Sequence, residues 1–337
     1  MLKIDMHAHI LPRDWPNLSE KYGVPGFPYM QFSENRSHIY RDGKFFREVW
    51  DNSWNAEKRI EEFAGFGVQV QVLSTVPVMF SYWAQAEHAA DMARILNDHI
   101  AGVVDQYPQN YIGLGTLPLQ SAELAIAEAE RCRKLDLRGI QIGSHINQWN
   151  LDAPELFPIF EALQDLELAL LVHPWDMMGS DSMPKYWLPW LVGMPAEQSR
   201  AICCMILGGV LERLPRLKVC FAHGGGSFPF TIGRIQHGFE MRPDLVGTDN
   251  DKGPRDYVGK FYLDSVVHDP KALAYLIDLF GTQNLMLGSD YPFPLGEQRP
   301  GSGIDALALS DTQRKQIYNG SALQWLGIER SFFEDIP

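Results

Sequence analysis

The chain has 337 residues, of which 45% are hydrophobic and 21% are charged, as in an ordinary soluble globular protein. Its formal net charge of −13 argues against nucleic acid and anionic membrane surfaces as partners, because both are themselves negatively charged. A metal ion and one or two arginines can still make a locally positive pocket for an anionic small molecule.

The first ten residues contain two histidines at the end of a predicted strand over residues 3–7. Apolar and polar residues alternate along this strand up to His7 and His9. Because successive side chains of a strand point to opposite faces, the spacing places both imidazoles on one face. Two imidazoles on one side of a strand end can chelate one metal ion. The meaning of so short a motif depends on the rest of the chain.

The next segment, residues 11–55, is rich in aromatic residues, glycine and proline. It is too long for a simple connection between a strand and a helix. We expect an insertion with a small β substructure. Such a cap lies over the end of the first strand and can bring a residue to a site there.

Short apolar runs alternate with amphipathic stretches along the rest of the chain. Residues 86–106 and 121–135 predict helices, the second with Ser121 as its N-cap. The predicted strands cover residues 3–7, 68–74, 111–117, 139–143, 168–173, 217–223, 261–265 and 285–289. Most are apolar on both faces, which indicates a parallel sheet. Eight such units predict an α/β fold, a (β/α)₈ TIM barrel. This fold can keep residues 1–337 in one domain, with residues 11–55 as a capping insertion.

Residues of the types that bind metal ions lie at or just after the ends of three predicted strands. His173 ends the fifth strand and Asp290 follows the eighth, while His7 and His9 lie at the end of the first. Active sites of such barrels lie at the carboxyl ends of the strands. Three imidazoles and one carboxylate suit Zn²⁺ and leave a position for water or substrate. A single strand-end histidine is more often a hydrogen-bonded core residue, so the prediction depends on the set as a whole.

His223 ends the sixth predicted strand and is followed by three glycines, residues 224–226. Glycines allow the backbone to approach a site closely. Because four ligands are already assigned, we predict that His223 is a proton shuttle. Imidazole titrates near neutral pH and could deprotonate a metal-bound water. The alternatives are a fifth metal ligand and a structural histidine that orients a ligand.

Seven segments resemble the amidohydrolase superfamily and, within it, a branch of decarboxylases. They are residues 4–12, 74–80, 139–143, 172–177, 186–197, 221–228 and 287–297. The resemblance implies zinc on His7, His9, His173 and Asp290, with His223 as the acid/base. It also implies that Arg47 and Arg234 bind substrate carboxylates, with Arg234 reaching the site from the other subunit of a homodimer. Planar guanidinium groups suit a dicarboxylate substrate.

The activity that the resemblance implies is a decarboxylation that requires no O₂. It converts 2-amino-3-carboxymuconate 6-semialdehyde to 2-aminomuconate 6-semialdehyde and CO₂, in tryptophan or kynurenine-type catabolism. Alternatives at the same site are hydrolysis of an amide or lactone, and decarboxylation of an aromatic acid such as a hydroxybenzoate. Paired arginines favour a dicarboxylate over a neutral amide. A non-catalytic metal-binding protein would leave His223 and its glycines unexplained.

Two further expectations concern assembly and location. Residues 186–211 are apolar on all sides, and a helix that covers a barrel needs only one apolar stripe, so we predict a homodimer that buries this region. The four cysteines form no Cys-x-x-Cys pair, and we expect them to be reduced in a cytoplasmic protein. We expect neither a signal peptide nor a membrane span.

Overall fold

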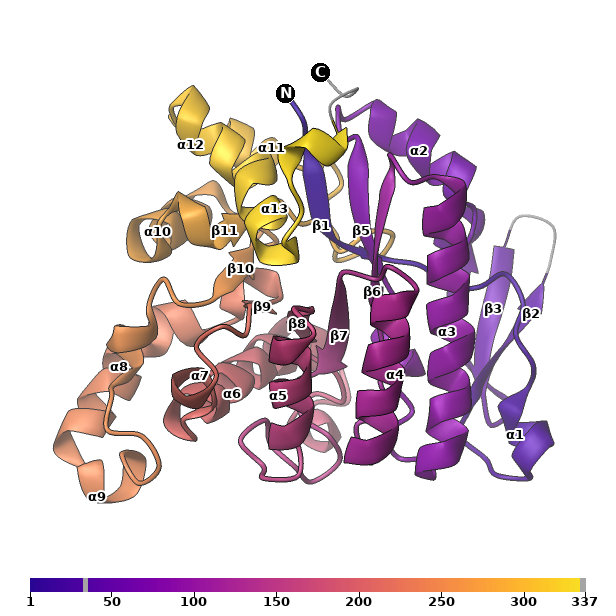
Figure 1. Ribbon diagram of the computed structural model, residues 1–337, viewed down its shortest axis with the longest axis horizontal. Coiled ribbons are helices and arrows are strands. Elements are labelled where there is room, and N and C mark those ends of the chain that lie inside the picture. Colours follow the sequence, from indigo (N-terminus) through magenta and orange to yellow (C-terminus); the bar gives the residue numbers. More distant parts are fainter. Residues whose placement is uncertain (33–35, 334–337) are drawn as a thin grey trace.

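Eight parallel strands form a barrel at the centre of the computed structural model, which describes residues 1–32 and 36–333 (Figure 1). The strands are β1 (Ile4–His9), β5 (Val70–Ser74), β6 (Tyr111–Gly115), β7 (Gly139–Gly143), β8 (Ala169–His173), β9 (Val219–Phe221), β10 (Tyr262–Asp264) and β11 (Leu285–Met286). They follow one another around the sheet in chain order. The main chains of Met6 and Leu287 are hydrogen-bonded (2.8 Å), which brings the last strand back to the first. The predicted (β/α)₈ TIM barrel is confirmed.

Helices surround the barrel because most strands are followed by an amphipathic segment. Their bounds are α1 (Leu18–Tyr22), α2 (Ala56–Ala64), α3 (Ala86–Gln106), α4 (Ala122–Lys134), α5 (Phe157–Asp165), α6 (Met194–Leu207), α7 (Val210–Arg213), α8 (Phe228–Met241), α9 (Pro243–Val246), α10 (Pro270–Phe280), α11 (Ser302–Asp305), α12 (Asp311–Lys315) and α13 (Ser321–Leu326). The predicted helix over residues 86–106 is α3, and Ser121 caps α4 by accepting a hydrogen bond from the backbone of Leu124 (3.4 Å). None of the described helices is long and apolar enough to cross a membrane.

Two apolar layers hold the barrel in place. Alternate strand residues such as Ile4, Val72 and Leu171 form one buried cluster together with Trp325 of α13, whose indole donates a hydrogen bond to the carbonyl of Lys218 (3.0 Å). The intervening strand residues belong to a second cluster with the surrounding helices. Side chains that fill the barrel make it a packed core rather than a pore. The strand ends that carry the polar residues are therefore fixed on a rigid support.

The insertion after the first strand contains a three-stranded antiparallel sheet, β2 (Pro28–Phe32), β3 (Arg36–Arg41) and β4 (Lys44–Trp50). The predicted β substructure is thereby confirmed. Figure 1 shows this sheet beside α1 and α3. Ile39 and Val49 are buried in one apolar cluster with Met79 and Met92, so one face of the sheet packs against the barrel. Residues 33–35 of the predicted insertion and residues 334–337 lie outside the described residues.

Six of the predicted strands are shorter in the structure. The two largest differences are in the predictions over residues 217–223 and 285–289, which correspond to Val219–Phe221 and Leu285–Met286. His223 (φ 55°) and Asp290 (φ 57°) adopt left-handed backbone conformations, which extended strands do not contain. The chain therefore leaves the extended conformation at both residues.

Candidate active site

β1 contains a β-bulge between Asp5 and Ala8, so His7 lies within the bulge and His9 follows it. Asp5 pairs with Gln71 and Ala8 pairs with Leu73, so β1 contains one residue more than β5 over this interval. A bulge re-aims the side chains at and next to it. The Nε2 atoms of His7 and His9 lie 3.1 Å apart, and both side chains are fully buried. The spacing predicted their convergence but not the bulge that accompanies it.

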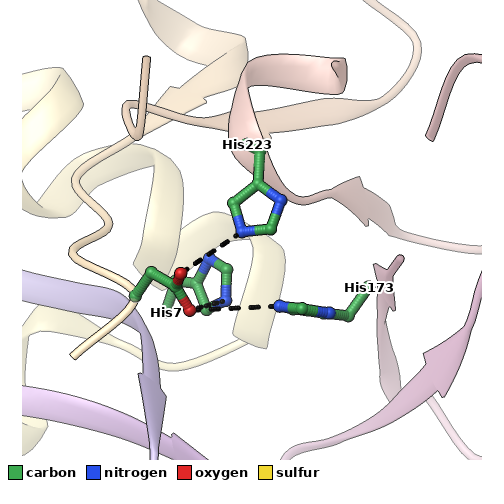
Figure 2. A group of neighbouring side chains, drawn as sticks. His7, His173 and His223 are labelled. Atoms are coloured by element: carbon green, nitrogen blue, oxygen red, sulfur yellow. Dashed lines mark ion pairs between the residues drawn. The ribbon is translucent and has the colours of Figure 1, made fainter. Parts of the chain in front are cut away.

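The carboxylate of Asp290 is surrounded by four imidazoles. Its Oδ1 lies 3.1 Å from Nε2 of His9, 3.5 Å from that of His7 and 4.0 Å from that of His173, and its Oδ2 lies 3.6 Å from Nε2 of His223. Figure 2 shows His7, His173 and His223 pointing toward one another. These three histidines and Asp290 each offer one ligand atom, and the four atoms all lie within 4.8 Å of one another. The structure thus brings together all five residues predicted for the metal site and the proton shuttle.

Three of the imidazoles are oriented by an acceptor at Nδ1. These acceptors are the Asp264 carboxylate for His7 (2.7 Å), the Thr75 carbonyl for His9 (2.9 Å) and the Pro174 carbonyl for His173 (2.8 Å). A ring that donates from Nδ1 keeps an unprotonated Nε2, which is the form that binds a metal. Among the described residues, Nε2 of His173 is buried without a hydrogen-bond partner. The donor set and this unpartnered atom fit a divalent metal ion.

His223 differs from the other three histidines. Both of its ring nitrogens are buried without a hydrogen-bond partner in the described part of the chain. Its backbone, however, is held firmly, because Asp264 accepts hydrogen bonds from the main-chain nitrogens of His223 (2.9 Å) and Gly224 (2.8 Å). A fixed backbone and an unengaged ring suit a residue that transfers a proton.

Asp264 is a site residue that the sequence reasoning missed. It ends β10, is fully buried, and contacts both the ring of His7 and the backbone of His223. Its position at a strand end is the same signal that identified His173 and Asp290, so the signal was present in the sequence.

Burial and the neighbouring groups set the protonation states of the cluster. Burial alone would raise the pKa of Asp290, but the neighbouring imidazoles of His173, His223 and His9 hold that pKa well below its usual range. Burial lowers the pKa of His173 to about 3. Burial would also raise the pKa of Asp264, but the hydrogen bond with His7 holds it below its ordinary value. A carboxylate and a neutral imidazole are the forms that bind a metal.

The cluster lies beside a cavity of about 350 Å³. His9, His173 and Asp290 line the cavity, and much of the remaining wall is aromatic. A cavity of this size fits a small molecule, and a few polar groups among apolar ones can orient it.

A family model described as amidohydrolase matches residues 4–328. The chain belongs to this family. It is 55% identical over 331 residues to the 2-amino-3-carboxymuconate-6-semialdehyde decarboxylase of Dictyostelium discoideum. The alignment covers 97% of this chain and 92% of the relative.

Two solved structures share the fold of this amidohydrolase. The apo form of IDCase from Metarhizium anisopliae superposes with a TM-score of 0.83 at 24% identity, covering 97% of each chain. A dihydroxybenzoic acid decarboxylase from Polaromonas sp. JS666, solved with manganese and the inhibitor 2-nitroresorcinol, gives a TM-score of 0.77 at 21% identity. That match covers 98% of this chain and 99% of the other.

The two arginines predicted to bind substrate occupy different places in this amidohydrolase. Arg47 of β4 lines the cavity with its guanidinium 4.8 Å from the ring centre of Phe293. Burial lowers the pKa of Arg47, while the nearby Asp290 carboxylate opposes that shift. Arg234 of α8 is exposed and is not among the described residues that line the cavity. Arg41 of β3 also lines the cavity, although the sequence did not single it out.

A fully buried arginine holds the main chain of the site in place. Arg59 of α2 donates hydrogen bonds to the carbonyl of His9 (2.6 Å) and to the side chain of Gln71 (3.2 Å). Its guanidinium lies 4.7 Å from the ring centre of Tyr291, the residue after Asp290. Arg59 therefore fixes the main chain of His9 and packs against the residue that follows Asp290. An arginine on an amphipathic helix gives no sequence signal for such a role, because most arginines are exposed.

Proposed function

We propose that this amidohydrolase is a metal-dependent decarboxylase of 2-amino-3-carboxymuconate 6-semialdehyde, which it converts without O₂ to 2-aminomuconate 6-semialdehyde and CO₂. The observation that carries this proposal is the cluster of four imidazoles and Asp290 beside a cavity whose wall contains Arg47. A metal and a guanidinium together can hold an acidic substrate. The 55% identity with a decarboxylase named for this substrate supports the choice of substrate.

The metal that we propose is zinc, held by His7, His9, His173 and Asp290. A donor set with three imidazoles suits zinc better than manganese, which prefers oxygen ligands. When bound, the metal supplies a Lewis acid and lowers the pKa of a coordinated water toward ~7.

His223 is proposed as the acid/base of the reaction. Its unengaged ring, 3.6 Å from the carboxylate of Asp290, can accept a proton and return it to the substrate. A proton from His223 first adds to the carbon that carries the leaving carboxylate, which becomes sp³ at the expense of the conjugated double bond. The bond to the carboxylate then breaks, CO₂ leaves, and the electron pair of that bond re-forms the conjugated double bond, so that the proton has replaced the carboxylate. No organic cofactor is needed.

Arg47 is proposed to bind a substrate carboxylate. It projects from the cap into the cavity, and the structure shows no carboxylate within ion-pair distance of it among the described residues. A guanidinium that is available to a ligand can form two parallel hydrogen bonds with a carboxylate.

We also propose a homodimer in which Arg234 serves the neighbouring subunit's cavity. The apolar residues of the predicted interface, 186–211, divide into two groups. Ile202, Met205 and Ile206 are buried within their own chain, whereas Tyr186 and Leu191 are exposed. Trp187 and Val192 are exposed as well, at 42% and 54%. The dimer proposal therefore depends on residues 186–192, and Arg234 is exposed as a contribution to a second cavity requires.

A second candidate is the decarboxylation of an aromatic acid such as a hydroxybenzoate. The cavity wall contains the indoles of Trp83, Trp175, Trp187 and Trp190, and flat aromatic faces suit a planar ring. The remaining expectations stay predictions: a place in tryptophan or kynurenine-type catabolism, a cytoplasmic location, and one domain over residues 1–337 with residues 11–55 as its cap.

An absorbance assay distinguishes these candidates. The substrate, generated enzymatically, is offered to the purified protein with and without a metal chelator, and a dihydroxybenzoate is offered in parallel. We expect the semialdehyde to be consumed with release of CO₂ and the chelator to stop the reaction. Consumption of the dihydroxybenzoate alone would replace the first proposal with the second, and turnover of neither acid would contradict both.

A further inference from the structure

The cap presents two arginines to the cavity from one face of its small sheet. In the β3–β4 register Ser37 lies opposite Val49, and Ile39 lies opposite Arg47. Ser37, Ile39 and Val49 are buried, which identifies this face as the one packed against the barrel. Arg41 is two residues beyond Ile39 on the same strand, so it shares this face with Arg47. Both arginines line the cavity.

The spacing of the two arginines lets their guanidinium groups meet one ligand. Arg41 lies two residues beyond Ile39, the residue opposite Arg47, and a β-bulge between these positions places Lys44 opposite Arg41. Diagonal neighbours in a regular ladder are about 7–8 Å apart, and long side chains bridge a separation of this order. Arg47 reaches the inner wall at Phe293, whereas Arg41 lies 5.6 Å from the ring centre of Trp83.

Neither arginine is neutralised by the protein. In the described part of the chain, no carboxylate lies within 4.0 Å of the guanidinium of Arg41 or Arg47, although many other arginines form ion pairs. Two unpaired guanidinium groups in one cavity of a chain with a net charge of −13 indicate a local site for a dianion.

We infer that Arg41 is a substrate-binding residue that makes the cavity specific for a dicarboxylate. This inference deepens the proposed function and depends on it for the identity of the substrate. In 2-amino-3-carboxymuconate 6-semialdehyde the two carboxylates are attached to neighbouring carbons. Arg47, the arginine near Asp290, binds one of them, and Arg41 binds the other from the Trp83 side of the cavity. The Arg234 proposed to come from the partner subunit would then share one of these two carboxylates with an arginine of the cap. A substrate with a single carboxylate leaves Arg41 without a partner.

The test compares two unreactive ligands that differ by one carboxylate. Phthalate carries two carboxylates on neighbouring sp² carbons, and benzoate carries one. Their dissociation constants are measured by calorimetry on the metal-loaded protein, on Arg41→Gln and on Arg41→Lys. Arg36→Gln is the matched control, because Arg36 is also on β3 and also lies over an indole (Trp50, 4.7 Å) but does not line the cavity.

Arg41→Gln is expected to raise the dissociation constant of phthalate about tenfold or more, which is the usual effect of losing a charged hydrogen bond. The dissociation constant of benzoate should not change. Arg41→Lys should recover part of the loss, and Arg36→Gln should change neither ligand. With the muconate semialdehyde, Arg41→Gln should raise KM far more than it lowers kcat.

The inference is overturned if Arg41→Gln weakens the binding of both ligands equally or of neither. It is also overturned if the unmodified protein does not bind phthalate more tightly than benzoate. The two ligands do not require turnover. If the protein binds phthalate through Arg41 and yet does not consume the semialdehyde, the proposed function fails while the dicarboxylate site stands.

Discussion

Substitution of Asp264 by asparagine should weaken metal binding although Asp264 is not a proposed ligand. Its Oδ2 accepts hydrogen bonds from the ring of His7 (2.7 Å) and the backbone of His223 (2.9 Å), and its Oδ1 accepts from the backbone of Gly224 (2.8 Å) and Val266 (3.1 Å). An amide has only one oxygen, so one pair of donors must face an NH₂ group. The backbone N–H groups of Gly224 and Val266 both point to the Oδ1 position, so the amide oxygen of the asparagine should lie there. Its NH₂ group then faces the ring of His7.

The ring of His7 then loses its acceptor, and the tautomer with a proton on Nε2 becomes the favoured one. That proton occupies the position of a metal. Loss of an outer partner of a metal-binding histidine typically reduces affinity about 10–100-fold, or about 1.4–2.8 kcal/mol.

The assay is a competition titration with a chromophoric chelator, which gives the zinc dissociation constant of each variant, together with thermal unfolding of the metal-free proteins. Asp269→Asn is the control, because Asp269 caps α10 at an exposed position and asparagine is an equally good cap. Unchanged zinc affinity in a folded Asp264→Asn variant would refute the role assigned to Asp264.

Three other predictions follow from the same geometry. His223→Ala should keep its metal and lose about 10²–10⁴-fold in kcat, because the ring acts on a proton; loss of zinc from this variant would make His223 a ligand, and unchanged turnover would remove it from the mechanism. Arg59→Met should lower the free energy of unfolding by about 1–3 kcal/mol, since the buried carbonyl of His9 loses its donor; urea unfolding measures this, with the exposed Arg216→Met as the control, and equal stability of the two variants would contradict it. Mixed dimers of inactive Arg234→Ala and His223→Ala chains should recover some activity, because one cavity of the mixed dimer has both residues intact; absence of recovery after subunit exchange proven by mass spectrometry would place Arg234 outside the partner's site.

The barrel could be predicted from the sequence because its local patterns agree with its global fold. Strands that are apolar on both faces, separated by amphipathic helices, have few alternatives to a parallel barrel. The largest errors in the predicted boundaries are in the two strands that precede the left-handed residues His223 and Asp290. An apolar run does not show where its backbone turns.

The candidate site was predictable where its residues end strands, and not where tertiary packing sets their roles. The strand-end signal identified His173 and Asp290, and it applies equally to Asp264. The positions of Arg41 and Arg59 depend on which face of the cap packs against the barrel and on how α2 docks. The apolar stretch 186–211 suggested a single interface, but Ile202 and its neighbours turned out to belong to the core of their own chain. Periodicity cannot separate these two uses of apolar residues.

The most direct test of a metal-dependent decarboxylase is a zinc titration of the metal-free protein, with release of CO₂ from the muconate semialdehyde as the readout. We predict that activity rises from zero and reaches a plateau at about one zinc per chain, as expected for a site with histidine and carboxylate ligands. The His7→Ala, His9→Ala double variant should stay inactive at every zinc concentration. Full activity without metal, or a double variant that still binds zinc and turns over substrate, would contradict the account.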